Sequence, residues 1–175
     1  ATLNPLYQFN SGATNQVTFS NGNLKAQSAL NDKVVQANMG VRTGKWYWET
    51  RIYNDEMVGI GSIGGSMSNY PGSNYNGISY HKGGAVFRGQ GSVAYGAGWS
   101  GSDYHIIGCA ADLDNNILYW HVDGTWANSA NPSAGTGGYS ITSDFNGNLP
   151  TAYITPSWRV RSSGATEQVH VNFGQ

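Results

Sequence analysis

Charged side chains are scarce in this sequence. The 175 residues include 9 Lys and Arg and 10 Asp and Glu, or 11% charged residues, whereas a typical soluble domain carries about 25%. The formal net charge of -1 leaves no basic excess to neutralise phosphates, which excludes a typical nucleic-acid-binding protein. With only 7 Leu, 3 Glu and 4 Lys, the sequence also lacks the residues from which coiled coils and helical bundles are built.

Cysteine and long apolar runs are nearly absent as well. The single cysteine, Cys109, excludes an intramolecular disulfide bond. The longest apolar stretch, residues 106–111, spans 6 residues, whereas a membrane-spanning helix needs about 20, so we expect no membrane insertion. The chain begins Ala-Thr-Leu-Asn-Pro, without an initiator Met or a signal peptide. This leaves open whether it is a whole protein or part of a larger one.

Aromatic residues and glycine are abundant instead. The 6 Trp, 11 Tyr and 5 Phe offer ample apolar area to bury, so the composition does not fit intrinsic disorder. A length of 175 residues suits one domain with its own core, since roughly 100–200 residues is typical. We therefore predict a single domain, residues 1–175.

Turn signals and short apolar runs alternate along the chain. Four dipeptides of a kind that tolerates positive φ mark turns, at Asn21-Gly22, Asn76-Gly77, Asp123-Gly124 and Asn146-Gly147. Between them, runs rich in β-branched and aromatic residues predict strands, at residues 16–20, 33–39, 46–53, 57–63, 106–112, 117–122, 151–155 and 168–173.

The fold class follows from this pattern. In the run from residue 46, the alternate residues Trp46, Trp48, Thr50 and Ile52 share one face of a strand. No convincing helical stretch separates the strands, so the sequence predicts an all-β, mostly antiparallel fold without substantial helix. Two packed sheets could bury this many aromatic side chains, whereas one sheet could not.

Two long stretches, residues 64–77 and 127–138, consist almost wholly of Gly, Ser, Asn, Pro and Ala. Loops of this length without structure of their own are uncommon unless they bind something or are flexible. The first stretch carries Tyr70 and Tyr75, which are candidate contact residues. A plain solvated connection is the alternative.

One pattern in the sequence partly matches a metal site. Asp112, Asp114 and Asn116 are spaced like the start of a calcium-binding loop, and Asp123 falls at its twelfth place. The sixth place needs Gly for a sharp turn but is Ile117, and the bidentate Glu is missing. The four His residues show no ligand spacing, at positions 81, 105, 121 and 170. We therefore predict a plain hairpin turn, with no metal and no other cofactor.

Residue patterns of catalysis are also missing. Cys109 lies in an apolar run without a basic neighbour, as expected of a buried small hydrophobic residue. No Gly-x-Ser-x-Gly motif occurs. The three Glu residues, Glu49, Glu56 and Glu167, form no Glu-x-Asp-x-Glu pattern of the kind that glycoside hydrolysis uses. We predict no catalytic residues and no enzymatic activity.

Several segments in a fixed order resemble one protein family. They are Gly44-Lys45-Trp46-Tyr47-Trp48-Glu49, Val58-Gly59-Ile60-Gly61, Ile107-Gly108-Cys109-Ala110-Ala111-Asp112-Leu113-Asp114, Ile117-Leu118-Tyr119-Trp120-His121-Val122-Asp123-Gly124 and Val171-Asn172-Phe173-Gly174-Gln175. Their order, spacing and total length resemble the SPRY domain family over residues 18–175, which leaves residues 1–17 as an N-terminal segment. The resemblance implies a bent, concanavalin-like β-sandwich of two antiparallel sheets that is used for binding and not for catalysis.

The resemblance also suggests where a ligand would bind. In peptide-recognising members of the family, the ligand sits on loops at one edge of the sandwich and contacts two aromatic residues. The nearest matches are Phe87, followed by Arg88, and Trp158, followed by Arg159. Packing in the core or at a sheet edge is the alternative for both aromatic residues.

Two further tryptophans stand in loop-like surroundings. Trp99 is flanked by Gly98 and by Ser100-Gly101, and Trp126 follows the Asp-Gly turn. An exposed Trp in a Gly-rich loop can anchor a protein or a sugar. The predicted binding residues are therefore Tyr70, Tyr75, Phe87, Arg88, Trp99, Trp126, Trp158 and Arg159.

A narrower resemblance rests on the opening and the overall style of the sequence. An early Asn-Pro, the run Val17-Thr18-Phe19-Ser20-Asn21-Gly22-Asn23-Leu24 and the Asn-Phe-Gly-Gln ending are similar to SPRY-type modules of tailed-bacteriophage structural proteins. This resemblance implies a non-enzymatic virion component (a decoration, appendage or tail-fibre module) on the particle surface, with other virion proteins or copies of itself as partners. The alternatives are a lectin-like module for a host-surface glycan or receptor, and a cellular SPRY adaptor that binds a short peptide.

Overall fold

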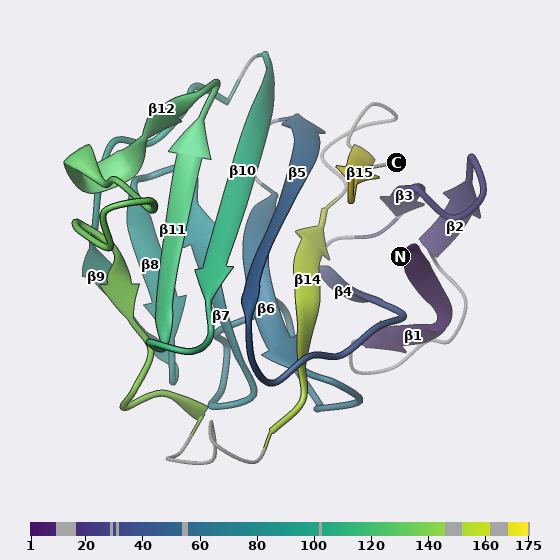
Figure 1. Ribbon diagram of the computed structural model, residues 1–175. Helices are drawn as coiled ribbons and strands as arrows, with labels where there is room; N and C mark the ends of the chain where they lie inside the picture. The colour runs from purple at the N-terminus through teal and green to yellow at the C-terminus, as the bar shows by residue number, and fades with distance from the viewer. Residues whose placement is uncertain are drawn as a thin grey trace.

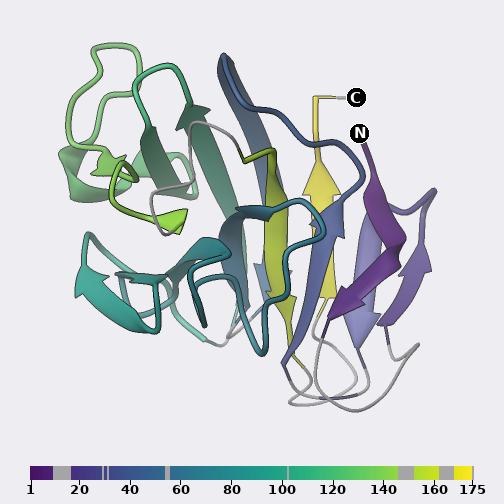
Figure 2. The same cartoon turned by 90° about the horizontal axis from the view of Figure 1, so that it is seen from below.

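A computed structural model shows a sandwich of two antiparallel β-sheets (Figures 1 and 2). It describes residues 1–9, 17–28, 30, 32–53, 56–101, 103–145, 152–161 and 168–174. One sheet has the strand order β1(Leu3–Phe9), β4(Lys33–Ala37), β14(Ile154–Val160), β6(Met57–Ser62), β7(Gly77–His81), β8(Ala85–Arg88) and β9(Gly91–Ala94). The other has β12(Thr125–Trp126), β11(Ile117–Val122), β10(Tyr104–Asp112), β5(Lys45–Tyr53), β15(Gln168–Asn172), β3(Lys25–Ser28) and β2(Val17–Ser20), while β13(Tyr139–Ser140) pairs with β11.

Helix is almost absent from the part of the chain that the structure describes. Its one helical element is the short 3-10 turn η1(Ala127–Ser129). No helix among the described residues is long and apolar enough to span a membrane. The predicted fold class, an all-β sandwich of two antiparallel sheets, is confirmed.

The alternation in β5 sorts side chains between the core and the outer face as predicted, with one exception at the strand start. Trp48, Thr50 and Ile52 are buried between the sheets, whereas Tyr47 is exposed on the outer face. Trp46 belongs to the inward set but remains 40% exposed. It lies near the end of the sandwich, where its side chain is only partly covered.

The largest side chains of the core are aromatic. Trp120 stacks on Tyr80 with ring centroids 5.5 Å apart, and Tyr95 meets Trp120 edge-on at 5.6 Å. The indole N–H of Trp120 donates to the carbonyl of Val58 in the opposite sheet at 3.1 Å. Trp158 likewise donates to the hydroxyl of Thr50 at 2.8 Å. Buried indole donors therefore connect the two sheets through hydrogen bonds as well as through apolar contact.

Most predicted strands are present, with shifted ends. The predicted strand at 151–155 is observed as β14, Ile154–Val160, which begins later and extends past Trp158. Residues 16 and 151 and the Asn146-Gly147 turn lie outside the described residues. The pattern missed β1, β3, β7, β8, β9 and the two short strands β12 and β13. Their short or polar sequences, such as Lys-Ala-Gln-Ser in β3 and Gly-Ser-Val-Ala in β9, carry little apolar alternation.

The N-terminal segment contributes directly to the sandwich. β1 pairs with β4, and Leu3 is fully buried in the core. The family motifs begin only at residue 18, so this strand could not be assigned from them. The run Leu-Asn-Pro-Leu-Tyr-Gln-Phe shows no regular alternation, because β1 is an edge strand in which Leu3 is buried whereas Leu6 is 96% exposed.

Two of the buried tryptophans of the core, Trp158 and Trp48, allow a matched stability test. Trp158 donates to Thr50, whereas the indole N–H of Trp48 has no acceptor among the described residues. Trp158→Phe removes a donor from a buried hydroxyl, so it should cost at least about 1 kcal/mol more unfolding free energy than Trp48→Phe. Urea titration of both variants measures this difference, and an equal or larger loss in Trp48→Phe would contradict it.

Candidate functional site

Two of the predicted binding residues lie in the core. Trp158 is 0% exposed, and its indole N–H donates a hydrogen bond to the hydroxyl of Thr50. Trp99 is also buried and packs against Tyr80 with ring centroids 5.7 Å apart. The backbone N–H of Trp99 donates to the carbonyl of Lys82 at 3.0 Å. Both tryptophans therefore stabilise the sandwich and present no ring face to a ligand.

The residues around the first long loop form a packed cluster. Tyr70 meets Phe87 edge-on with ring centroids 5.4 Å apart, so the loop folds back onto β8. Arg88 lies 3.7 Å from the buried carboxyl group of Asp144. Burial raises the pKa of this carboxyl group, and the positive charge of Arg88 opposes the increase. Tyr75 is exposed. The loop thus attaches to the sheet through apolar contact while leaving one tyrosine at the surface.

Arg159 belongs neither with the two core tryptophans nor with the cluster around the first long loop. Its side chain is mostly buried, and its Nε lies 3.8 Å from Oδ1 of Asp32. The structure therefore places Arg159 in an ion pair beside β4 and away from Phe87 and Tyr70. The eight predicted residues do not converge on one surface.

Trp126 is the predicted residue that lines a cavity. An open groove of about 520 Å³, which we call the loop groove, lies between the segment after β9 and the segment from β11 to η1. Its lining residues come from the edges of both sheets, and they are Tyr95, Gly96, Ala97, Gly98, Val122, Thr125, Trp126, Ala127, Asn128 and Ser129. Edge strands β9 and β12 bring these loops together (Figure 1).

The first wall of the loop groove is fixed to the core. The hydroxyl of Tyr80 donates to the carbonyl of Ala97. The N–H groups of Tyr95 and Gly96 both donate to the carbonyl of Gly84 at 3.0 Å. A Cβ at Gly96 would come within 2.7 Å of the Ala127 side chain. Only glycine therefore allows this wall to approach η1 so closely.

The second wall is held by one carbonyl group. Asn128 donates its side-chain amide to the carbonyl of Gly137 at 3.0 Å, and the hydroxyl of Tyr95 donates to the same oxygen at 3.0 Å. Asn128 and Ser129 both adopt positive φ, at 55° and 51°. Two consecutive non-glycine residues in this region are unusual, and such backbone strain is common at functional sites.

Trp126 is supported from beneath by His121. The two rings meet edge-on with centroids 5.0 Å apart. The backbone N–H of Gly124 donates to Nδ1 of His121 at 3.1 Å, so the proton of the neutral ring resides on Nε2. Nε2 lies 2.7 Å from the hydroxyl of Tyr47, which in turn donates to Glu49 at 2.7 Å. A hydrogen-bond chain thus runs from the exposed face of β5 to the ring under Trp126.

This chain requires glycine at the centre of β10. Gly108 pairs with Glu49 on one side and with His121 on the other. A Cβ at Gly108 would come within 2.0 Å of Nε2 of His121. The absence of a side chain therefore lets the His121 ring lie over β10 and reach Tyr47.

The turn before Trp126 is held by a second histidine. Nδ1 of His105 lies 2.7 Å from Oδ2 of Asp123, and the N–H of Ile106 donates to Oδ1 at 2.8 Å. These contacts lower the pKa of Asp123 against the opposing effect of burial. Two histidines and one carboxylate therefore fix the Asp123-Gly124 turn that presents Trp126 to the groove.

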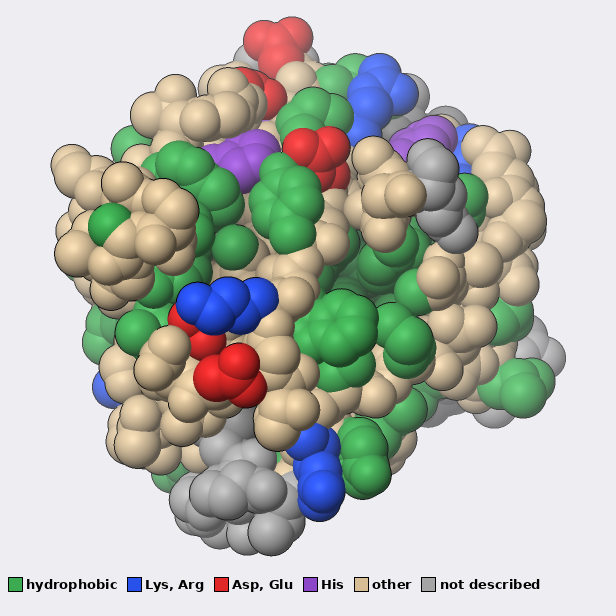
Figure 3. Space-filling model, viewed as in Figure 1, with side chains coloured by type: hydrophobic (Ala, Val, Ile, Leu, Met, Phe, Trp, Pro, Cys, Tyr) green, Lys and Arg blue, Asp and Glu red, His purple; other side chains and the backbone are tan. Residues whose placement is uncertain are grey.

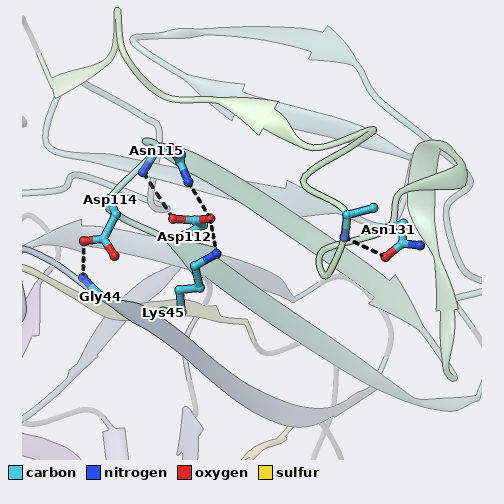
Figure 4. A network of polar contacts seen from close by, with 7 residues as sticks. Gly44, Lys45, Asp112, Asp114, Asn115 and Asn131 are labelled. Carbon is cyan, nitrogen blue, oxygen red and sulfur yellow. Dashed lines mark hydrogen bonds and ion pairs between the residues drawn. The ribbon is translucent and has the colours of Figure 1, made fainter.

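The candidate calcium ligands serve a hairpin instead (Figure 4). Asp112 accepts the backbone and side-chain N–H groups of Asn115 at 3.1 and 2.9 Å, and Nζ of Lys45 lies 3.0 Å away. Oδ1 of Asp114 accepts the N–H of Gly44 at 2.7 Å. A similar contact, from the N–H of Ala134 to Oδ1 of Asn131 at 3.1 Å, closes a turn in the second long loop. No group of three or more His, Cys, Asp and Glu residues that could hold a metal occurs within the described ranges.

Cys109 is unsuited to act as a nucleophile. It is fully buried, and burial raises the pKa of its thiol well above the ordinary value. The thiolate is the reactive form, so a raised pKa in an enclosed site makes the group inert. This placement agrees with the expected buried hydrophobic role.

Most residues of the loop groove lie outside the predicted binding set. Tyr95, Thr125, Asn128 and Ser129 were not predicted to bind. Asn128 and Ser129 lie in the second long loop, whose composition was the available signal. Tyr95 follows β9, a strand that the pattern did not reveal, so its place opposite Trp126 depends on tertiary packing.

Comparisons with known proteins identify similar folds but no matching sequence family. The sequence matches no protein-family model and no curated protein. The SPRY domain of human HERC1 superposes with a TM-score of 0.70 at 15% identity, covering 99% of this chain and 98% of that chain. A human SPRY domain gives 0.66 at 15% identity, with 92% and 97% covered. Stonustoxin gives 0.67 at 17% identity, with 98% of this chain and 26% of the toxin chain covered.

These neighbours show the fold of a SPRY domain. The broader of the two resemblances seen in the sequence is therefore confirmed at the level of fold. None of the three structures is described as a virion protein, so the comparisons give no support to the narrower resemblance to phage modules.

The burial of His121 beneath Trp126 predicts that the stability of the fold depends on pH. Burial lowers the pKa of His121, opposed by the charges of Glu49 and Asp123. Below the unfolded-state pKa of about 6.5, the unfolded chain takes up a proton that the folded chain resists, so stability falls. Between about pH 7.5 and about pH 5.5 the melting temperature should therefore decrease more in the wild type than in His121→Gln. Equal decreases in calorimetry would show that His121 is not the titrating group.

Proposed function

We propose that the chain is a non-enzymatic module that binds another protein through the loop groove. The observation that carries this proposal is the groove itself. Its volume of about 520 Å³ falls within the roughly 300–1,000 Å³ of typical ligand sites. It lies where the edges of the two sheets meet and is walled by aromatic side chains and short polar residues.

The groove residues suit recognition of a polypeptide. Trp126 and Tyr95 are half-buried and held in place by contacts on their far sides. Rigid aromatic side chains give contact area at low entropic cost, while Thr125, Asn128 and Ser129 offer adaptable hydrogen bonds. The walls are tied to the core before a ligand arrives, which reduces the ordering cost of binding.

The likeness to SPRY domains supports the same proposal, because that resemblance implies binding without catalysis. It favours the adaptor alternative of the sequence analysis over the virion component. The virion location, the virion partners and the glycan alternative stay predictions. Among the described residues, Cys109 is buried and Glu49 is engaged by Tyr47, so neither favours an enzyme.

Blocking the groove tests this function. Thr125 is an exposed groove residue on edge strand β12, and Thr18 is an exposed residue on β2, the opposite edge of the same sheet. Thr125→Arg should therefore reduce the affinity for peptides at least about tenfold, whereas Thr18→Arg should leave it unchanged. The peptides are selected from a displayed random library on the immobilised wild-type chain and then measured by calorimetry.

Three outcomes would contradict the proposal. Peptides that bind the Thr125→Arg variant as well as the wild type would show that the groove is not the site. Failure to select any peptide would argue against peptide recognition. Binding on a glycan array that Thr125→Arg abolishes and Thr18→Arg preserves would assign the groove to sugars instead.

A further inference from the structure

A second cavity opens between the sheets at the end of the sandwich where β5 begins. This apolar pocket has a volume of about 110 Å³. Its buried walls include Ala37, Trp48, Ile60, Ala111 and Ile154. Two large side chains of its lining remain partly in solvent, namely Met39 at 44% and Trp46 at 40% exposed. Figure 3 shows a hollow bordered by hydrophobic side chains on the face that carries β5 and β14.

The polar groups of several lining residues are already paired. The hydroxyl of Thr155 donates to the carbonyl of Ala37 at 3.2 Å, and the indole N–H of Trp46 donates to the carbonyl of Thr43 at 2.8 Å. The hydroxyl of Tyr47 is engaged by Glu49 and His121. A ligand therefore gains by covering apolar surface, and it displaces none of these hydrogen bonds.

The position of Trp46 is fixed before any ligand arrives. On one side of it in the chain, Gly44 donates to Asp114 at 2.7 Å, and Lys45 pairs with Asp112 at 3.0 Å (Figure 4). On the other side, β5 continues in register with β10, where Trp46 lies opposite Ala111. The contacts of Asp112 and Asp114 therefore also hold this wall of the pocket in place.

The size of the pocket limits the group that enters. An apolar cavity of about 150 Å³ accommodates benzene, so the smaller pocket suits one branched aliphatic side chain. The exposed surfaces of Met39 and Trp46 extend beyond the cavity. A free molecule small enough to enter would leave these surfaces wet, whereas a protein that inserts one side chain also covers them.

A positive charge, that of Arg42, lies beside the opening. Val41 and Ile154, which line the pocket, exchange backbone hydrogen bonds of 2.8 and 2.9 Å. Their chain neighbours Arg42 and Tyr153 stack, with the guanidinium carbon 4.8 Å from the ring centroid. The ion pairs within the described ranges join Lys45, Arg88, His105 and Arg159 to carboxylates, and none involves Arg42. An acidic group on the partner would complement this arginine.

We propose that the apolar pocket anchors a leucine-like side chain of a partner protein, with an acidic residue next to it that pairs with Arg42. The pocket is distinct from the loop groove, because the two linings share no residue. The proposal rests on the proposed protein-binding function for its choice of a protein as occupant. The apolar pocket is then a second contact with the partner, and it prefers a leucine-like side chain next to an acidic residue.

Two blocked dipeptides test the anchor directly. We expect acetyl-Asp-Leu-amide, titrated to about 10 mM into the ¹⁵N-labelled chain, to shift the Trp46 indole resonance and the amides that line the pocket. Acetyl-Asn-Leu-amide should bind at least about threefold more weakly. Acetyl-Asp-Gly-amide should cause no shift at the pocket, because it lacks the aliphatic side chain.

Matched variants separate the pocket from general surface effects. Arg42→Gln should remove the preference for Asp over Asn, and Trp46→Ala should abolish binding of both leucine dipeptides. The controls are Arg51→Gln, where Arg51 also stacks on a tyrosine at 3.8 Å, and Tyr104→Ala, where Tyr104 is 41% exposed. Both controls should leave dipeptide binding unchanged, because neither residue lines the pocket.

The proposal fails if no pocket resonance shifts at the highest dipeptide concentration. It also fails if the glycine dipeptide shifts the same resonances, or if Arg51→Gln removes the Asp preference as Arg42→Gln does. If Trp46→Ala unfolds, the Arg42→Gln comparison still decides the result. Thr125→Arg should bind the dipeptide normally, so loss of groove binding and loss of pocket binding are independent outcomes.

Discussion

The pairing of β5 with β10 is the contact on which both candidate sites depend. The two strands run antiparallel in unbroken register from Lys45 opposite Asp112 to Tyr53 opposite Tyr104. Because side chains alternate across a strand, this register sends Trp48 into the core and Tyr47 to the outer face. A shift by one residue would exchange the two sets and destroy the core together with the support of both sites.

Each face of the pair serves a different cavity. On the inner face, Trp46 lies at the strand start and forms a wall of the apolar pocket. On the outer face, Tyr47 reaches across Gly108 to His121, whose ring lies under Trp126 at the loop groove. Neighbouring residues of one strand therefore support sites at different places on the sandwich. The rigid sheet gives both cavities walls that are formed before binding.

Sequence reasoning succeeded where the determinants are local. The alternation in β5 and the Asp-Gly turn were predicted from a few adjacent residues, because a strand period and positive φ are local properties. It failed where exposure depends on what packs above a residue. Trp99 has glycine neighbours typical of a loop, yet Gly98 contributes to a close backbone approach near Lys82 that encloses the tryptophan. Tyr95 and Trp126 meet only after both sheets have formed.

The scarcity of charged residues also limits how either cavity can bind a partner. Two of the ion pairs among the described residues secure a turn or a strand end, namely Lys45 with Asp112 at the β5 start and His105 with Asp123 at the β11 end. Few charges remain for recognition, so affinity at either cavity must come mainly from shape and apolar burial, with hydrogen bonds to short polar side chains. Under these conditions an arginine beside an apolar pocket, Arg42, which forms no ion pair within the described ranges, can contribute to specificity by pairing with a partner's carboxylate.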